Sequence, residues 1–213
     1  MARNPMKMTL GMIIRRGNYA YFFYYWLYGL VLDYRLAGRS LSQTVFYKAD
    51  GAYPVQSISY PYIKALEPHL NFGCNEIFVD VGCAWGRLIG YMRLHTQLEK
   101  FVGVELNGEV AKCAQRIFSY DQNVTIIEGD IIENLPLEGT IFYLFNPFDK
   151  TVLERFLMEI EEKIKNPIKL MYLYPTCREI IDARQPRWSL IKELEIKPKH
   201  LGALKLCIYK YKP

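Results

Sequence analysis

Three acidic side chains and one amide come directly after short apolar runs in the middle of this sequence. Asp80 and Glu105 end the first two runs, Asp130 follows the third, and Asn146 ends the fourth. A carboxylate beside buried apolar residues is costly unless it has a partner, and its two oxygens can accept two N–H or O–H donors. Ligands of open α/β sheets bind at the carboxyl ends of the strands. We therefore expect the four side chains to converge on one ligand.

Small residues alternate in the turn that follows the first run, at Gly82, Ala84 and Gly86. Small residues let the backbone approach a ligand closely, and amides at a helix N-terminus are free to donate to it. Asp80 beside this turn suits a ligand with donors of its own, such as an amino group, better than a dinucleotide pyrophosphate. The NAD-binding fingerprint also needs a glycine at position 87, where this chain has Arg.

The elements that must position these residues follow from the alternation of apolar runs with amphipathic stretches. Strands are predicted at Ile77–Val81, Phe101–Glu105, Asn123–Ile127, Thr140–Phe145 and Ile168–Tyr174. Alternating strands and helices indicate a parallel α/β sheet. The stretches Trp188–Ile196 and Ala203–Tyr211 follow with little helix between them, which predicts a terminal antiparallel hairpin.

Helix starts are marked by capping residues. Ser59 or Tyr60 precedes Pro61, which suits the first turn of a helix. Arg87 to Thr96 should form the helix after the small-residue turn. Asn107 and Asp149 each precede an amphipathic stretch, so each is predicted to cap a helix.

Length and composition bound the remaining possibilities. The chain of 213 residues fits one domain at residues 41–213 with an extension at residues 1–40. The net charge of +5 gives weak support for an anionic partner. Five scattered cysteines show no metal-ligand spacing and no disulfide framework, so no metal site is expected and a cytoplasmic location is the simplest.

An aromatic run at Tyr19–Leu32 follows the basic pair Arg15 and Arg16. The run is shorter than the roughly 20 residues that cross a membrane, and no cleavage site marks it as a signal peptide. Two interpretations stay open. Residues 15–32 could make a peripheral contact with a membrane interface, or the run could be a helix packed on the domain or in a dimer contact.

The segment VDVGCAWG resembles motif I, hh[DE]hGxGxG, of the class I S-adenosylmethionine (SAM) methyltransferases, with Ala84 in place of the middle glycine. The resemblance implies SAM as cofactor and S-adenosylhomocysteine as product. It also implies a Rossmann-like, seven-stranded, mostly parallel sheet with a terminal antiparallel hairpin and helices on both faces. Asp80 would order the methionine end of SAM, beside the turn residues Gly82, Cys83, Ala84 and Gly86.

The same resemblance assigns roles to the later strand ends. An acid at the position of Glu105 accepts both ribose hydroxyls of SAM in that family. The acid at the position of Asp130 accepts the adenine amino group, and the backbone amide of Ile131 meets a ring nitrogen. Leu106 and Ile131 would lie on the two faces of the adenine.

The segment LFNPF resembles motif IV, [DN]PP[FYW], of the amino-methyltransferases of DNA and protein, with one proline missing. In that family the Asn side chain and the following backbone carbonyl hold the target amine, which implies a catalytic and cofactor-side role for Asn146. The combined segments LDYRLAG, VDVGCAWGR, VGVELN, EGDI and YLFNPF also resemble a group of small bacterial methyltransferases that accompany polysaccharide-biosynthesis enzymes. A more distant resemblance is to lysine methyltransferases.

The sequence therefore predicts an enzyme that transfers a methyl group from SAM by in-line displacement. The acceptor stays open between an amine and a sugar or glycolipid intermediate, with a protein lysine as the alternative. The expected partner is a small molecule, a carbohydrate or a protein, and no specific nucleic acid. Two alternatives of other classes remain, an NAD-binding oxidoreductase and a non-catalytic SAM-binding scaffold.

Overall fold

A single seven-stranded sheet organises the computed structural model, which describes residues 19–46, 51–70 and 72–213. The strand order is β5-β4-β3-β6-β7-β9-β8. Neighbours from β5 to β7 pair in parallel, and β9 pairs antiparallel with both β7 and β8. The strands are β3 (Ile77–Val81), β4 (Lys100–Glu105), β5 (Val124–Glu128), β6 (Ile141–Phe145), β7 (Ile168–Leu173), β8 (Trp188–Ile196) and β9 (Leu204–Tyr211). Every predicted strand is confirmed to within a residue or so at its ends.

The sheet reverses its strand order around β3. The chain moves outward from β3 through β4 to β5 on one side, and then returns to place β6 on the other side of β3. A ligand crevice forms at the carboxyl ends of the strands at such a switch point. The register sets Asp80 of β3 beside Gly103 of β4 and Tyr143 of β6, so this acid sits at the centre of the sheet.

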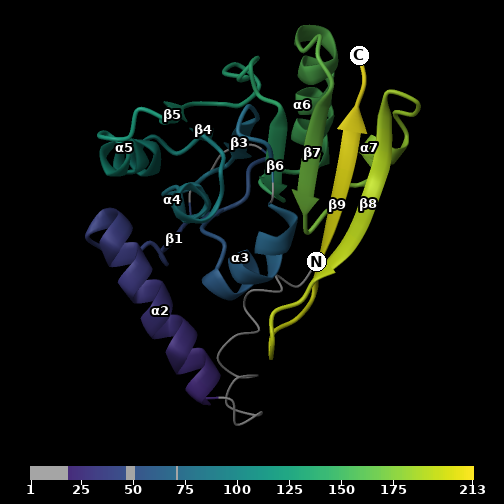
Figure 1. Cartoon of the computed structure of the whole chain (residues 1–213). Coiled ribbons are helices and arrows are strands. Elements are labelled where there is room, and N and C mark those ends of the chain that lie inside the picture. The colour runs from purple at the N-terminus through teal and green to yellow at the C-terminus, as the bar shows by residue number, and fades with distance from the viewer. Residues whose placement is uncertain (1–18, 47–50, 71) are drawn as a thin grey trace.

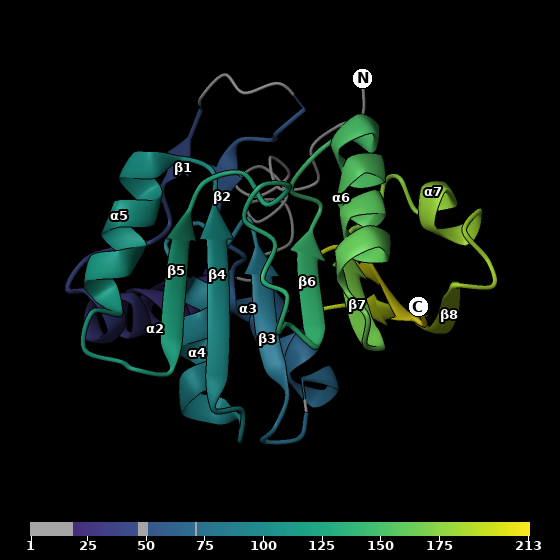
Figure 2. The same ribbon diagram turned by 90° about the horizontal axis from the view of Figure 1, so that it is seen from above.

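Helices cover both faces of the sheet, as predicted (Figure 2). One core cluster joins the sheet to α3 (Tyr60–Leu66) and α4 (Arg87–His95), with Ala114 of α5 (Gly108–Ile117). The other joins it to α6 (Lys150–Lys163) and the short α7 (Glu179–Asp182). A 3-10 turn, η2 (Glu67–His69), continues α3 past its end.

The predicted caps are present at the helix starts. The side chain of Asn107 accepts the Val110 amide at 3.1 Å, and that of Asp149 accepts the Val152 amide at 3.0 Å. Ser59 is the N-cap residue of α3, with a proline in the first turn, but its side chain accepts no amide of that helix. The other two caps differ in this respect. These caps satisfy amides that have no partner inside the helix and fix where α5 and α6 leave the sheet.

The aromatic run forms the long helix α2 (Tyr19–Ala37), which lies beside α4 and α3 (Figure 1). Tyr25, Tyr28, Leu32 and Leu36 pack against the core on that face of the sheet. The approach is close, because a Cβ added at Gly90 of α4 would lie 2.3 Å from Leu36 Cδ2. The interpretation of the run as a helix packed on the domain is confirmed for this side of α2.

No helix in the described ranges is both long enough and apolar enough to pass through a bilayer. The division of the chain into residues 1–40 and 41–213 stays a prediction.

The segment after α2 covers the carboxyl ends of the strands, a position to which the sequence patterns assigned no element. Its strands β1 (Thr44–Val45) and β2 (Val55–Gln56) form a separate antiparallel pair. Ala52 and Phe148 form an isolated antiparallel bridge, in which the Tyr53 amide donates to the Pro147 carbonyl at 3.0 Å. This segment is thereby fixed against the loop that follows β6.

Candidate functional site

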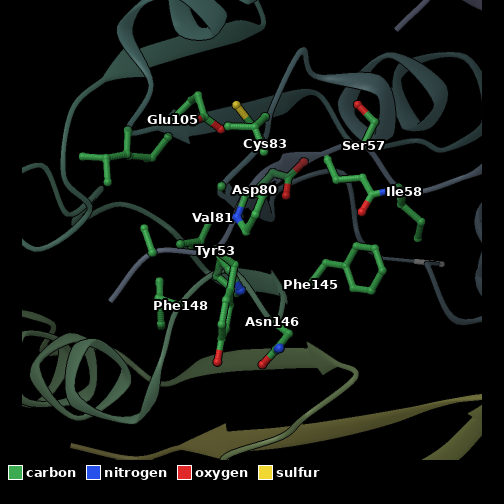
Figure 3. Close-up of a pocket in the computed structure, with 18 of the residues that line it drawn as sticks. Tyr53, Ser57, Ile58, Asp80, Val81, Cys83, Glu105, Phe145, Asn146 and Phe148 are labelled. Atoms are coloured by element: carbon green, nitrogen blue, oxygen red, sulfur yellow. The ribbon is translucent and has the colours of Figure 1, made fainter. Parts of the chain in front are cut away.

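A cavity of about 640 Å³ opens at the carboxyl ends of β3, β4 and β6 (Figure 3). Its volume lies within the usual range for small-molecule sites. Most of the predicted site residues line it, from four separate places in the sequence: Asp80, Gly82, Cys83, Glu105, Leu106, Asp130, Ile131 and Asn146. The expectation that the strand-end polar groups converge is confirmed.

Two predicted site residues, Ala84 and Gly86, do not line the cavity. Ala84 has a left-handed backbone with φ of 52°, and its side chain is buried in a small cluster with Trp85 and Leu41. Its methyl group therefore packs away from the cavity. Gly86 has φ of 77°, and an added Cβ would lie 2.4 Å from Phe118 Cε2. Both positions shape the turn.

The turn offers fewer free amides than expected. The amides of Gly82 and Cys83 donate to the Val104 carbonyl at 2.8 and 3.1 Å, and that of Gly86 donates to the Cys83 carbonyl at 2.8 Å. The Ala84 amide donates to Glu105 Oε2 at 2.9 Å. The prediction of ligand-binding amides is therefore wrong for these four groups, because the tight turn uses them itself.

Glu105 is held in place by backbone amides. It is only 3% exposed, and Oε1 accepts the Asn107 amide at 2.8 Å while Oε2 accepts the Ala84 amide. Burial raises the pKa of Glu105, and the amide hydrogen bonds act in the opposite direction. Each oxygen retains a second lone pair. A preoriented carboxylate can thus still accept two hydroxyl donors from a ligand.

Asp80 is also buried, and it has no hydrogen-bond partner within the described residues. Burial, followed by the negative charge of Glu105, raises the pKa of Asp80 to about 8. The hydroxyls of Tyr143 and Ser57 also line the cavity and are buried without a partner among the described residues. Buried polar groups are normally hydrogen-bonded. One carboxyl and two hydroxyls are therefore available to a ligand that carries both a positive donor group and acceptor oxygens.

Asp130 sits just beyond β5, with Oδ1 accepting the Ile132 amide at 2.9 Å. Its second oxygen makes no hydrogen bond among the described residues. Leu106 and Ile131 add apolar surface to the same part of the lining. A flat ring that carries an amino group suits this combination of an acceptor oxygen with apolar side chains.

The geometry of Asn146 differs from the predicted one. Its side-chain oxygen accepts the Tyr172 hydroxyl at 2.9 Å and the Thr176 hydroxyl at 2.7 Å. These two bonds use both lone pairs of the amide oxygen. The Pro147 carbonyl accepts the Tyr53 amide. The Asn146 oxygen therefore does not fit the predicted role of taking hydrogens from a target amine, and the side-chain NH₂ is the group that remains.

Arg87 pairs with a carboxylate of the N-terminal helix. Its guanidinium contacts Asp33 of α2 at 2.6 Å and also donates to the Ile58 carbonyl at 3.2 Å and to Ser42 Oγ at 2.7 Å. Arg87 lines the cavity, but its hydrogen bonds to these partners hold the side chain within the cavity wall. Asp33 was not singled out from the sequence.

The sequence also missed one whole wall of the cavity. The segment around β1 and β2 contributes a run of lining residues: Thr44, Phe46, Tyr53, Pro54, Val55, Gln56, Ser57 and Ile58. No periodic pattern marks this stretch. Tyr174 also lines the cavity, directly after β7, with a left-handed φ of 54°. Tyr174 is the last residue of the fifth predicted strand. A residue with a polar group at a strand end was the signal that could have identified it.

No protein-family model matches the chain, and no curated protein matches its sequence. Solved structures do resemble it. The B. subtilis M1A22 tRNA methyltransferase TrmK aligns with a TM-score of 0.58 and 13% identity over 70% of this chain, which spans 65% of that protein. An RNA methyltransferase from Salinibacter ruber, in complex with S-adenosylhomocysteine, aligns at 0.54 and 17% over 73% of this chain and 93% of that one. The mitomycin 7-O-methyltransferase MmcR aligns at 0.54 and 12% over 70% of this chain and 53% of that one. The chain thus has the fold that these methyltransferases share.

Proposed function

We propose that this protein is a SAM-dependent methyltransferase. The observation that carries the proposal is the set of three acids, Asp80, Glu105 and Asp130, which line one cavity at the switch point of a methyltransferase-like sheet. SAM carries donors that match them: two ribose hydroxyls, an adenine amino group and an ammonium group. The absence of a glycine at position 87 disfavours a dinucleotide.

The residues present fit SAM along its length. Glu105 would accept the ribose hydroxyls, and Asp130 with Ile131 would hold the adenine. Asp80 would accept from the ammonium group, while the unpartnered hydroxyls of Ser57 and Tyr143 would donate to the carboxylate at the same end. When bound, SAM supplies a methyl group already activated on a sulfonium.

The chain's own contribution to the reaction is positioning and the exclusion of water. The wall formed by β1, β2 and the loop after β6 covers the carboxyl ends of the strands. Holding two reactants in line can lower a barrier by about 7–11 kcal/mol. None of the three histidines, all of which lie in the described part, lines the cavity, so no imidazole base is placed there. The phenols of Tyr53, Tyr62, Tyr143 and Tyr174 line the cavity, together with the ring of Phe148.

The acceptor is a small molecule, a carbohydrate or a protein side chain in this proposal. An amine and a sugar or glycolipid oxygen are both retained, with a protein lysine as the alternative. The occupied oxygen of Asn146 gives an amine less support than the motif did. The similar structures are described with tRNA, RNA and mitomycin acceptors, so the shared fold does not name one.

Calorimetric titration with SAM, S-adenosylhomocysteine and NAD tests the proposal. We expect both adenosyl ligands to bind and NAD to show no heat. Binding of NAD without binding of SAM would overturn the proposal in favour of an oxidoreductase. A second measurement separates an enzyme from a scaffold, namely the transfer of tritium from methyl-labelled SAM into a cell extract. SAM binding without any transfer would favour the scaffold.

We place the protein in the cytoplasm. A peripheral membrane contact was predicted for residues 15–32. Residues 15–18 lie outside the described residues, so the proposal retains this contact only for the part on α2.

A further inference from the structure

One side of helix α2 is an exposed apolar surface. Large apolar side chains recur at helical spacing on the side that faces away from the sheet. They are Phe23, Tyr24, Trp26, Leu27, Val31 and Tyr34, and each is at least 45% exposed. We refer to these six as the exposed α2 face. Phe23 and Trp26 are both 62% exposed, and their rings lie 5.9 Å apart.

Packing on the domain does not account for this composition. The opposite side of α2 already supplies the contacts to the core through Tyr25, Tyr28, Leu32 and Leu36, with Asp33 buried among them. A helix at a domain surface normally has polar residues on its outer side. Contiguous exposed apolar patches mark sites of interaction with proteins or membranes. The exposed α2 face therefore needs a partner of its own.

Positive charge flanks this uncharged surface. Arg35 is exposed in the last turn of α2, and Arg39 follows it, bonded to Gln43 and to the Cys113 sulfur. Neither arginine pairs with a carboxylate among the described residues. In the sequence, residues 1–18 contain four basic residues and no acidic one. A stretch of tyrosine, tryptophan and phenylalanine between basic segments suits the boundary between lipid headgroups and acyl chains.

We infer that the exposed α2 face docks on the surface of a bilayer that contains anionic lipid. The helix would lie in the plane of the interface, with its aromatic side chains among the headgroups and Arg35 near lipid phosphates. A second copy of this chain is the main competing occupant. In a two-fold pair the positively charged flanks of one copy would meet those of the other, or the uncharged face itself, which offers no charge complementarity. An anionic bilayer supplies the missing negative charge.

Tryptophan fluorescence gives a direct readout of this docking. The chain has three tryptophans, and Trp85 and Trp188 are 3% and 0% exposed, so Trp26 is the exposed one. The full chain is mixed with vesicles of phosphatidylcholine that contain about 30% phosphatidylglycerol, a composition that mimics an anionic leaflet. We expect the emission to shift to shorter wavelength as Trp26 leaves water, and the protein to float with the vesicles. Phosphatidylcholine alone should bind about tenfold more weakly, and added salt should weaken binding to the anionic vesicles.

Matched variants separate docking from a general loss of structure. Phe23→Ser/Trp26→Ser should reduce flotation about tenfold, since interfacial binding scales with buried apolar area. Tyr120→Ser changes a residue that is 99% exposed elsewhere and should float like the wild type. Arg35→Glu should weaken binding to the anionic vesicles and leave binding to phosphatidylcholine vesicles unchanged. Circular dichroism and the thermal midpoint verify that each variant folds.

Three outcomes would overturn the inference. The first is that the wild-type chain binds neither vesicle, and the second is that it binds both equally. Alternatively, sedimentation without lipid would reveal a dimer that the Phe23→Ser/Trp26→Ser substitution disperses, with no vesicle binding. The inference does not depend on methyl transfer, so it can fail or succeed independently of the proposed function.

Discussion

Arg87 of α4 donates two hydrogen bonds to Asp33 of α2, from Nε to Oδ1 at 3.0 Å and from Nη2 to Oδ2 at 2.6 Å. Both side chains are less than 5% exposed. Asp33 also accepts the Leu41 amide at 2.8 Å and the Tyr60 hydroxyl at 2.9 Å. One carboxylate therefore joins the N-terminal helix, the start of the cavity wall, α3 and the helix after motif I.

Removing this carboxylate should be strongly destabilising. Asp33→Ala leaves the Arg87 guanidinium buried and without its charge partner, which costs about 3–5 kcal/mol in comparable cases. Urea denaturation measures the free energy of unfolding. The partly exposed pair Arg93–Asp121 is the matched control, and Asp121→Ala should cost about 1 kcal/mol or less. Equal losses in the two variants would contradict a special role for the buried pair.

Glu105 provides the test of the cofactor site. Glu105→Gln keeps one acceptor oxygen but removes the charge, so SAM and S-adenosylhomocysteine should each bind about 1.5–3 kcal/mol more weakly, the usual value for a hydrogen bond to a charged group. Titration calorimetry measures both affinities. Glu138→Gln, at an exposed residue outside the cavity lining, should change neither. An unaltered affinity in Glu105→Gln would remove this residue from the ligand contacts.

Asp80 should make the protein less stable as the pH rises. Its folded-state pKa of about 8 lies above its ordinary value, so between about pH 4 and pH 8 the folded protein holds a proton that the unfolded chain has lost. The free energy of unfolding therefore falls with increasing pH across this window, by at most about 1.4 kcal/mol per pH unit from this group. Asp80→Asn should remove that part of the slope and be the more stable protein at pH 8.

Asp121 gives the control for this pH dependence. Its hydrogen bond to Arg93 lowers its pKa, so its contribution to stability is present at neutral pH and is lost in acid. Asp121→Asn should therefore lose stability at pH 8, where Asp80→Asn gains it. Thermal midpoints measured at several pH values would reveal the two signs. The same slope in wild type and Asp80→Asn would mean that Asp80 stays ionised in the folded protein.

Asn146 should affect methyl transfer more than cofactor affinity. Asn146→Ala removes the side-chain NH₂ that remains available, so we expect SAM affinity within about threefold, under roughly 1 kcal/mol, and transfer slowed tenfold or more. Thr176→Val removes one of the two hydroxyls that orient the amide and should slow transfer less. Thr151→Val on α6, outside the lining, is the matched control. Single-turnover transfer of tritium from labelled SAM gives the rates, and an unchanged rate in Asn146→Ala would leave this residue a purely structural part of the turn.

The fold was predictable because its signals are local. Strands β3, β4, β6 and β7 are short apolar runs buried on both faces. Asn107 and Asp149 mark the starts of two helices with side chains that act within three residues. The family resemblance implied the same seven-stranded, mostly parallel sheet. The position of α2 against the sheet depends on the ion pair between Asp33 and Arg87, which are 54 residues apart. A local sequence pattern cannot predict such a contact.

The candidate site was predictable only on the strand side. Asp80, Glu105 and Asp130 follow apolar runs, so their convergence follows from the topology of a parallel sheet. The opposite wall, formed by Thr44, Phe46 and residues 52–58, is held by a backbone bridge to the loop after β6. Backbone hydrogen bonds do not require particular residue types, so the sequence does not reveal them. The same reason explains the error at the turn, where the amides proved to be used by Val104 and Glu105.

The order of β7, β9 and β8 in the sheet has a consequence for synthesis on the ribosome. Residues 204–211 are made after β8, yet β9 lies between β7 and β8 and pairs with both. Until those residues emerge, the nascent chain holds β7 with an open edge, and β8 has no neighbour to pair with. Open strand edges attract other chains. A stop codon just before residue 204 would thus remove one strand from the product and leave β8 without its place in the sheet.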